Sequence, residues 1–487
     1  LNDAQDPLVL GLDVGSTATR GSLFDAAGRP IAKHRYKIPH SFTSAADGTS
    51  TIDADQVVDE IAAIVQRLAT PELIGRIGGV GLDTFASSLV GVDTAGKAIT
   101  PTYTYADSRC SRQVTELRLD LNEAAVQQRT GARLHTSYLA PRLRWLAETE
   151  PAAFAAVRSW LSIGEYAYLR LLGTTAAGTS TAAWTGLLNR FTGEWDDEML
   201  AAAGISAATL SPVHDPDQPL LPRSGSLAAD WPTVAVVPWF PPVSDGIASN
   251  LGAGATDAST VVASAATSGA LRVLVHDLPE QLPAGLWCYR IDRHRSLLGG
   301  ALNDVGRAIS WLEATLQLPD PVELDRTLIA EPESTTPLVL PYFSGERSTG
   351  WAANARAHLS GVSAATTPTA LFRGTFEGIA LSYGRVATQL REVAGQTRRI
   401  LASGRITADW PSWLQILADA LDAPVTPIVI KRSTLHGTAL LALETLAPDV
   451  RREPPTEGTT RIPVTTRRNY YDKQSALFQR TYECVIR

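Results

Sequence analysis

The chain has 487 residues, and at about 150 residues per domain this length predicts two large domains or three smaller ones. Its 43 basic and 50 acidic residues give a net charge of −7, which lacks the strongly positive field that nucleic acids and anionic membranes usually require. Hydrophobic residues make up 44% and charged residues 19% of the chain, so a disordered protein is excluded and a globular one with a large core is predicted.

The three cysteines lie far apart and show no Cys-x-x-Cys spacing, so neither a disulfide framework nor a zinc site is predicted. The first residues are polar, and no apolar run approaches the length of a membrane span. These features favour the reducing cytoplasm and predict neither a membrane nor a nucleic-acid partner. The sequence does not specify an oligomeric state, and a homodimer remains open.

The first half of the chain predicts a long α/β domain. Strands are expected at 8–13, 19–24 and 30–36, where glycine-bearing turns join them into a meander. Apolar residues at helical spacing predict a helix at 53–68, which is followed by strands at 77–82 and 89–93. Further helices are predicted at 122–129, 140–148, 151–157 and 164–172.

The second half repeats this logic after a proline-rich stretch. Residues 211–242 contain eight prolines, a density that predicts a linker or a long excursion. A strand-like start then ends at Ser244-Asp245-Gly246, and strands at 260–265 and 270–275 flank a turn. Later elements are predicted at 305–316, 370–390, 413–421, 438–446 and 470–482 as helices and at 399–402 as a strand. The predicted domains are therefore 1–242 and 243–447, with a tail at 448–487.

One apparent phosphate-binding motif is rejected. Residues 91–98 nearly match the loop GxxxxGK[ST], but the required hydroxyl residue is Ala98. Asp93-Thr94-Ala95-Gly96 is typical of a turn between two strands. A hairpin turn is predicted here.

A different phosphate site is predicted at the start of the chain. Asp13 stands at a strand end and is followed by Gly15, Ser16 and Thr17 in a tight turn. The glycine allows close backbone approach, the next two amides and hydroxyls can donate to phosphate oxygens, Asp13 can hold hydrated Mg²⁺, and Arg20 can offset charge on the γ-phosphate. An ordinary hairpin with a capping aspartate is the alternative.

The second half offers an analogous set of residues. Asp245-Gly246 ends a predicted strand, and Thr267, Ser268 and Gly269 form a turn between two others. Two such sets at matched places in similar halves predict that both halves hold one phosphate chain.

These motifs resemble the FGGY family of carbohydrate kinases. The resemblance extends over nearly the whole chain and also includes Tyr105-Ala106-Asp107-Ser108-Arg109 and the runs 141–145, 340–347 and 376–378. The runs 130–146, 243–254 and 344–357 look most like the gluconokinases, with the xylulokinases next. The resemblance implies an α/β fold of two actin-like (ribonuclease H-like) ATPase domains facing a central cleft, with the sugar deep in the cleft and ATP mainly on the second domain.

The resemblance also assigns roles to individual residues. Asp245 matches the catalytic base, which also contacts substrate and metal, and Asp13 matches the magnesium-associated aspartate. Residues implied to hold ATP and Mg²⁺ are Asp13, Gly15, Ser16, Thr17, Arg20, Thr267, Ser268, Gly269, Gly306 and Gly404. Residues implied to contact the sugar are Ser87, Asp107, Arg109 and Asp245.

Three positions depart from the family pattern. The adenosine loop, usually a glycine triplet, is Ala402-Ser403-Gly404. Ser87 stands where a histidine is often found, and Tyr105 replaces the usual tryptophan. These departures concern the substrate more than the reaction.

The expected reaction is transfer of the γ-phosphate of Mg·ATP to a hydroxyl of a sugar or sugar acid, with gluconate giving 6-phosphogluconate as the first choice. Xylulose or another pentulose or polyol is the runner-up substrate. A catalytically weak sugar-binding regulator and an actin- or chaperone-like ATPase are the competing classes. If gluconate is the substrate, Arg109, Arg142 and Arg347 are the candidates to bind its carboxylate.

Overall fold

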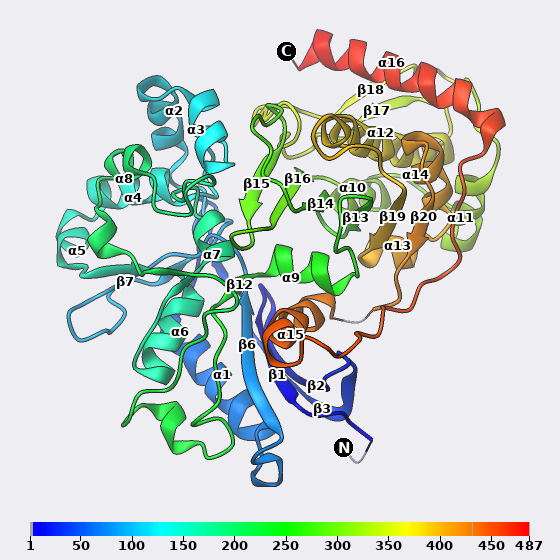
Figure 1. Cartoon of the computed structure of the whole chain (residues 1–487). Helices are drawn as coiled ribbons and strands as arrows, with labels where there is room; N and C mark the ends of the chain where they lie inside the picture. The colour runs from blue at the N-terminus through cyan, green and yellow to red at the C-terminus, as the bar shows by residue number, and fades with distance from the viewer. Residues whose placement is uncertain (1–2, 431, 487) are drawn as a thin grey trace. The chain divides into compact units, whose positions relative to one another are not determined.

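The structure, a computed structural model, describes residues 3–430 and 432–486. The chain divides into two compact units, each assembled from several segments (Figure 1). Unit 1 contains Leu1–Gly254, Cys288–Ser296 and Lys431–Pro454. Unit 2 contains Ala255–Trp287, Leu297–Ile430 and Pro455–Arg487.

Unit 1 is built on a five-stranded sheet with the order β12-β6-β1-β2-β3. The first three strands form the predicted antiparallel meander, whereas β6 is parallel to β1 and β12 is parallel to β6. β1 is buried along its whole length, as expected for a parallel strand that is covered on both faces. The strands are β1 (Leu8–Val14), β2 (Ala18–Phe24), β3 (Pro30–Pro39), β6 (Ile77–Thr84) and β12 (Val243–Ser244).

Two predicted helices pack together in unit 1. α1 (Ala54–Leu68) begins where the Asp53 side chain accepts a hydrogen bond from the Gln56 amide at 2.8 Å. α6 (Ile163–Leu172) begins with a reciprocal capping box between Ser162 and Glu165 and ends at Gly173. Both helices contribute to the apolar core that contains Leu12 and Leu82 of the sheet.

A second pair of helices in unit 1 comes from distant parts of the chain. α9 (Asp245–Gly252) packs on α15 (Ser433–Leu446), which Figure 1 draws in orange beside β1. A Cβ atom on Gly437 would lie 1.8 Å from the Ala248 carbonyl oxygen, and one on Gly252 would lie 1.9 Å from the Ser433 carbonyl oxygen. The two glycines therefore permit an approach that no larger residue allows.

The remaining elements of unit 1 are shorter. Several of them surround a separate apolar cluster that includes Leu117, Leu143 and Leu187. These elements are β4 (Thr43–Ser44), β5 (Ser50–Ile52), β7 (Val90–Val92), β8 (Thr102–Tyr103), α2 (Ser111–Asp120), α3 (Glu123–Thr130), α4 (Leu139–Thr149), α5 (Pro151–Ala156), β9 (Ser159–Leu161), β10 (Ala177–Gly178), α7 (Thr179–Ala183), α8 (Asp197–Ala203) and β11 (Val213–His214), with short 3₁₀ turns η1 (Pro71–Leu73), η2 (Ala207–Thr209) and η3 (Leu227–Asp230).

Unit 2 contains a six-stranded sheet with the order β15-β16-β14-β13-β19-β20. β13 is antiparallel to β14 and parallel to β19, and β19 is parallel to β20. The order β14-β13-β19-β20 has the same pairing as β2-β1-β6-β12 in unit 1. The β1–β2 and β13–β14 turns therefore occupy matched positions in the two sheets. The strands are β13 (Thr260–Ala265), β14 (Gly269–Val275), β15 (Trp287–Arg290), β16 (Ser296–Leu302), β19 (Arg399–Ser403) and β20 (Val425–Pro427).

A long central helix organises the rest of unit 2. α12 (Pro368–Ala394) starts with Thr367 as its cap and a proline in its first turn, and it packs against α14 and β17. The final helix, α16, adds Phe478 and Tyr482 to an apolar cluster with residues of β17. The other elements are α10 (Gly306–Thr315), α11 (Pro321–Ile329), β17 (Leu338–Leu340), β18 (His358–Ser360), α13 (Arg405–Asp409), α14 (Trp413–Leu421), η4 (Thr465–Arg467) and α16 (Arg468–Val485).

The structure selects one of two sequence alternatives and changes two other expectations. Residues 211–242 are an excursion within unit 1 and no linker, because Trp239 is buried in its core and the Val80 amide donates to the Pro238 carbonyl at 2.9 Å. The segment 243–246, expected to open the second domain, forms β12 and the start of α9 in unit 1. The predicted helix at 438–446 begins earlier, as α15, and also belongs to unit 1.

The rejected phosphate motif is a hairpin turn, as predicted. The Asp93 carboxylate accepts hydrogen bonds from the amides of Ala95 and Lys97, and Gly96 has a φ of 74°. No helix follows the motif within the described residues 91–110, so the arrangement of a phosphate loop is absent there.

Candidate active site

Three carboxylates lie at the carboxyl ends of neighbouring parallel strands in unit 1. Asp13 on β1 pairs in register with Asp83 on β6. Thr84 on β6 pairs with Ser244 on β12, and Asp245 follows directly as the first residue of α9. The sheet therefore brings the two predicted aspartates, Asp13 and Asp245, to the same edge, with one strand between them.

The middle carboxylate, Asp83, was not predicted from the sequence. It is fully buried, and its Oδ2 accepts a hydrogen bond from the Thr438 hydroxyl of α15 at 2.7 Å. Burial, with repulsion from Asp13 and Asp245, raises the pKa of this carboxyl well above its usual range. A sequence signal was present, because Gly81-Leu82-Asp83 repeats the Gly11-Leu12-Asp13 that ends β1.

The first predicted phosphate turn follows Asp13. Gly15 closes the turn by donating its amide to the Ala18 carbonyl at 3.1 Å, and Thr17 is exposed at its tip. Arg20 on β2 forms an ion pair with Asp13 at 2.9 Å and also donates to the Thr17 hydroxyl at 3.4 Å. Asp13 and Arg20, which were assigned to metal and phosphate, are thus neighbours that neutralise each other in this structure.

Asp107 and Arg109, which were predicted to contact the sugar, form an ion pair with each other. The Asp107 carboxylate accepts from the Arg109 guanidinium at 2.7 Å and from the Ser50 amide at 3.0 Å. The guanidinium lies over the Trp145 ring, 4.4 Å from its centroid. The pair is therefore anchored on two sides, and Arg109 remains half-buried.

Ser87 is connected to the helix that carries Asp245. Its hydroxyl donates to the Trp184 carbonyl at 2.6 Å. The Trp184 ring in turn covers Gly246, where a Cβ atom would lie 2.8 Å from the ring. Trp184 was missed in the sequence, although it is the one large aromatic residue in the Ala- and Thr-rich stretch 174–185.

Arg142, one of the three arginines considered for a substrate carboxylate, is fully buried in α4. Its guanidinium donates to the main-chain carbonyl of Ser87 at 2.9 Å and to that of Thr136 at 3.2 Å. Burial lowers the pKa of Arg142 from its usual value. The geometry makes this arginine a support for the loop at Ser87, which has a positive φ of 55°.

In unit 2, the second predicted phosphate turn is joined to the start of α10. Thr267 and Ser268 are exposed at the tip of the β13–β14 turn. The Gly306 amide donates to the Ala266 carbonyl at 2.8 Å, and the Arg307 amide donates to the Thr267 carbonyl at 3.2 Å. The structure thus brings Thr267, Ser268 and Gly306 together.

Gly404, the residue after β19, packs against the start of the same turn. A Cβ atom on Gly404 would lie 2.2 Å from the Ala265 carbonyl oxygen, and the residue has a φ of 105°. A Cβ atom on Gly306 would lie 2.6 Å from the Ala266 carbonyl oxygen. Both glycines are required for close backbone packing around the turn, so the altered adenosine loop keeps the glycine that this packing needs.

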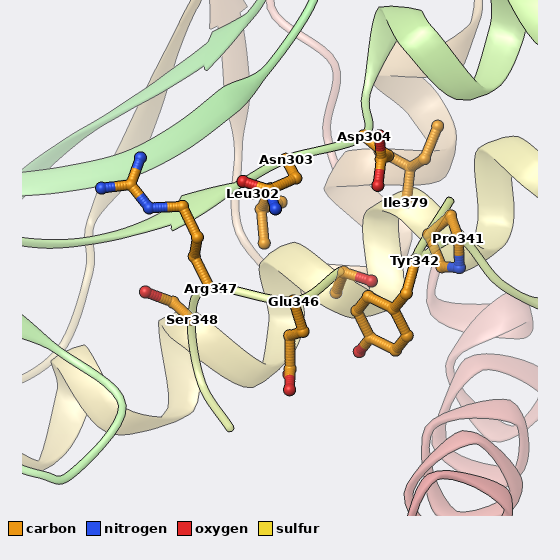
Figure 2. Close-up of a pocket in the computed structure, with 10 residues that line it drawn as sticks. Leu302, Asn303, Asp304, Pro341, Tyr342, Glu346, Arg347, Ser348 and Ile379 are labelled. Carbon is orange, nitrogen blue, oxygen red and sulfur yellow. The ribbon is translucent and has the colours of Figure 1, made fainter. Parts of the chain in front are cut away.

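A small pocket lies in unit 2, beside Asp304, which precedes Val305 and Gly306 (Figure 2). Asp304 accepts hydrogen bonds from the Ser344 amide and hydroxyl, both at 2.7 Å. Figure 2 shows that the side chains of Glu346 and of Arg347, the third candidate arginine, leave their loop in different directions. The pocket is lined by Leu302, Asn303, Asp304, Pro341, Tyr342, Glu346, Arg347, Ser348, Ile379 and Ser382.

The donor set fits nucleotide phosphates better than a protein-ligated metal. Among residues 3–430 and 432–486, no group of three or more His, Cys, Asp and Glu side chains is arranged to hold a metal ion. Exposed hydroxyl residues instead stand at both turns, Thr17 in one and Thr267 with Ser268 in the other. Mg²⁺ commonly binds through one or two carboxylates together with water and substrate phosphates, and Asp13 and Asp245 fit this type of site.

Two sheets with the same strand pairing, each with a hydroxylated turn after its first strand, fit the actin-like ATPase fold. The chain belongs to the FGGY family of carbohydrate kinases: residues 8–252 match the N-terminal domain of this family and residues 261–445 match its C-terminal domain. It is therefore a kinase with an alcohol group as acceptor. Asp245 falls within the matched N-terminal domain, and the predicted division at 242/243 differs from this match.

The gluconokinase of Bacillus subtilis (strain 168) is 25% identical over 450 residues, which cover 89% of this chain and 87% of the relative. The glycerol kinase of Rhodospirillum centenum is 27% identical over 459 residues, or 90% of this chain and 89% of the relative. Crystal structures of gluconate kinase and ligand-bound xylulose kinase from Lactobacillus acidophilus have TM-scores of 0.90 and 0.89, each at 24% identity with 98% of both chains covered. These structures show that the fold is shared.

None of the helices in the described part of the chain is both long enough and apolar enough to cross a membrane.

Proposed function

We propose that this kinase transfers the γ-phosphate of Mg·ATP to a hydroxyl of a sugar acid, with gluconate as the substrate and 6-phosphogluconate as the product. The observation that carries the proposal is the placement of Asp245 at the start of α9, on the same sheet edge as Asp13. A proton acceptor and a metal-associated carboxylate are the protein groups that phosphoryl transfer to an alcohol needs.

Asp245 acts as the general base in this proposal. Its carboxylate accepts the proton of the attacking hydroxyl, which makes the oxygen a better nucleophile. Trp184, packed over Gly246, and Ser87, bonded to the Trp184 backbone, form the adjoining wall that orients the sugar. Asp107 and Arg109 present polar groups to the same substrate.

Each of the two turns offers donor groups to nucleotide phosphates. Bound Mg·ATP supplies the transferable phosphoryl group and a metal charge that offsets the phosphates. The amides and hydroxyls of Ser16, Thr17, Thr267 and Ser268 donate to phosphate oxygens, and Arg20 exchanges part of its contact with Asp13 for the γ-phosphate. Gly306 and Gly404 fix the backbone of the second turn. With five lysines in the chain, none of them in a phosphate motif, this hydroxyl and arginine chemistry replaces a lysine.

Gluconate is favoured over other sugars because the B. subtilis gluconokinase is among the most similar relatives over most of both chains. Xylulose or another pentulose or polyol is the second candidate, because xylulose and glycerol kinases match over similar lengths. Among the three candidate arginines, Arg109 and Arg347 are half-buried and accessible to a carboxylate, whereas Arg142 is committed to backbone carbonyls.

A sugar-binding regulator with weak activity is the remaining alternative, and the altered loop Ala402–Gly404 motivates it. ATP consumption across aldonates, ketopentoses, polyols and hexoses tests the substrate. We expect gluconate to be phosphorylated fastest. Turnover of xylulose but not gluconate contradicts the substrate assignment, and no turnover of any sugar favours the regulator.

The role of Asp245 is tested by Asp245→Asn. We expect turnover to fall by about 10²- to 10⁴-fold, because the proton acceptor is lost, while ATP affinity changes by no more than about twofold. Asp197→Asn is the matched control, because Asp197 is also the first residue of a helix, α8, and is exposed. An Asp245→Asn enzyme that keeps a tenth of wild-type turnover contradicts the assignment.

A further inference from the structure

His40 lies directly behind the first phosphate turn of unit 1. It follows the last residue of β3, and its side chain is fully buried. The His40 amide donates to the Thr17 carbonyl at 3.1 Å, and its Nε2 lies 2.7 Å from the Gly15 carbonyl oxygen. One residue therefore holds the carbonyl groups on both sides of Ser16.

Glu60 on α1 holds His40 from the opposite side. Its Oε2 lies 2.8 Å from the His40 Nδ1 and also accepts a hydrogen bond from the Thr19 hydroxyl at 2.6 Å. Its Oε1 accepts from the Gln56 side chain at 2.9 Å. Glu60 is a buried carboxylate whose two oxygens are both engaged, and it links α1 to β2 and to the residue after β3.

We propose that His40 and Glu60 form a clasp that positions the first phosphate turn, residues 15–17, for binding nucleotide phosphates. A trans peptide is planar, and its carbonyl and amide groups point in opposite directions. Holding the Gly15 carbonyl toward His40 therefore directs the Ser16 amide to the other face of the turn. Holding the Thr17 carbonyl orients the following peptide, whose amide belongs to Ala18. The Ser16 amide, fixed in this way, is a ready phosphate donor.

The clasp requires both ring nitrogens of His40 to donate. Both of their partners, a main-chain carbonyl and a carboxylate, are acceptors. A neutral imidazole carries one N–H, so the two bonds coexist only when His40 is charged. The charged groups that face His40 are Glu60 from α1 and Arg20 from β2.

Burial by itself would lower the pKa of His40, but the hydrogen bond from His40 to Glu60 and that to the Gly15 carbonyl outweigh it, so the pKa is raised above 6.5. Arg20 opposes this rise. Both ring hydrogen bonds of the clasp are therefore present below pH 6.5, and one of them is lost as the pH rises through the folded-state pKa of His40. Affinity for ATP is expected to decline over the same interval.

This inference rests on the proposed role of the turn in ATP binding, and the test separates the two. The dissociation constant of Mg·ATP is measured by calorimetry between pH 6 and 9 for wild type, His40→Gln and Glu60→Gln. We expect the variants to bind ATP roughly three- to tenfold more weakly near neutral pH, the cost of one lost hydrogen bond. The wild-type affinity is expected to fall with rising pH, and His40→Gln is expected to show no such fall.

His34→Gln is the matched control, because His34 lies on β3 and contacts only its own strand in the described hydrogen bonds, at the Ala32 carbonyl. Nuclear magnetic resonance titration of the eight histidines, with His40 assigned by its loss in His40→Gln, reports the His40 pKa without nucleotide. If His40→Gln does not fold, Glu60→Gln carries the binding test, because it keeps the shape and removes the charge.

A wild-type protein that binds no ATP contradicts the proposed function. Wild-type binding of ATP together with unchanged affinity and pH profile in both variants contradicts the clasp alone. A His40 pKa at or below 6.5, with both variants weakened equally at every pH, contradicts the requirement for a charged His40.

Discussion

Arg142 illustrates how a residue's role depends on partners that the sequence does not reveal. In the sequence it is one of three arginines available to bind a carboxylate. In the structure its guanidinium is buried and bonded to the carbonyls of Ser87 and Thr136. These two bonds make Arg142 a support for the Ser87 loop.

We predict that Arg142→Met lowers the unfolding free energy by about 1–3 kcal/mol, because the Ser87 carbonyl loses a buried donor and the Thr136 carbonyl keeps only Cys110. The Michaelis constant for the sugar is expected to rise more than the turnover number falls, since the Ser87 loop is displaced. Chemical denaturation and steady-state kinetics check both effects. Arg144 lies on the same helix as Arg142 and forms a surface ion pair with Asp120 of α2, so Arg144→Met should change neither quantity by much. An unchanged Michaelis constant in Arg142→Met contradicts the positioning role.

A repeated tripeptide in the sequence indicates the position of Asp83, although Asp83 was not predicted as a site residue. Gly-Leu-Asp ends both β1 and β6, and the parallel register then places the second aspartate beside the first. The repeat is visible in the sequence. The partner Thr438 is not, because it lies on α15, hundreds of residues along the chain.

At the scale of elements, the position of Asp245 is set by the contact between α9 and α15. The backbones meet at Gly252 and Gly437, where neither helix has room for a side chain. Local periodicity predicted part of α15 but not this contact. The segment 243–246 was predicted to start a strand-led second domain. In the structure only Val243 and Ser244 are extended, and α9 begins at the next residue.

We predict that Gly437→Ala destabilises the protein by about 1–3 kcal/mol and reduces kinase activity, because the added methyl overlaps the Ala248 carbonyl and pushes α9 away from α15. Thermal unfolding and the kinase assay measure the two effects.

Gly384→Ala provides the control. Gly384 lies inside α12, where a Cβ atom would have no neighbour closer than 4.0 Å, so the substitution should be neutral or stabilise the helix by about 0.5–1 kcal/mol. Equal stability of the two variants contradicts the proposed tight contact.

Elements with local signals were predicted well. The meander β1–β3, the helices α1 and α6 and the turn at residues 93–97 depend on alternation, capping and turn residues within a few positions of one another. The short β12 and the two-glycine helix contact depend on partners far along the chain, so no local pattern indicates them.

At the scale of the whole molecule, each unit has its own apolar core. Leu12 and Leu82 belong to a core of unit 1, whereas Leu340, Phe478 and Tyr482 belong to a cluster of unit 2. In the second cluster the Arg385 guanidinium bonds to Glu346 at 2.7 Å and lies 3.7 Å from the centre of the Tyr482 ring, and the Tyr482 hydroxyl donates to Glu346. The last helix therefore holds the loop that lines the unit 2 pocket.

We predict that Tyr482→Phe speeds hydrogen exchange in α16 and in residues 342–351 and lowers stability by about 1 kcal/mol, because Glu346 loses a donor. Exchange measured by mass spectrometry should be unchanged in β1 and β6 of unit 1. Tyr471→Phe, on the same helix, is the comparison. Faster exchange throughout both units contradicts separate cores.

The sequence by itself determined the class of the protein and the local parts of its site. The net negative charge argued against a nucleic-acid partner, the scarcity of lysine directed attention to hydroxyl and arginine chemistry, and the two hydroxylated turns were identified from adjacent residues. Tertiary structure decided that Asp13, Asp83 and Asp245 share one edge, that Arg142 supports Ser87, and that His40 holds the first turn. The reason is physical: a turn is made by neighbouring peptides, whereas sheet register and buried hydrogen bonds join residues that only the folded chain brings together.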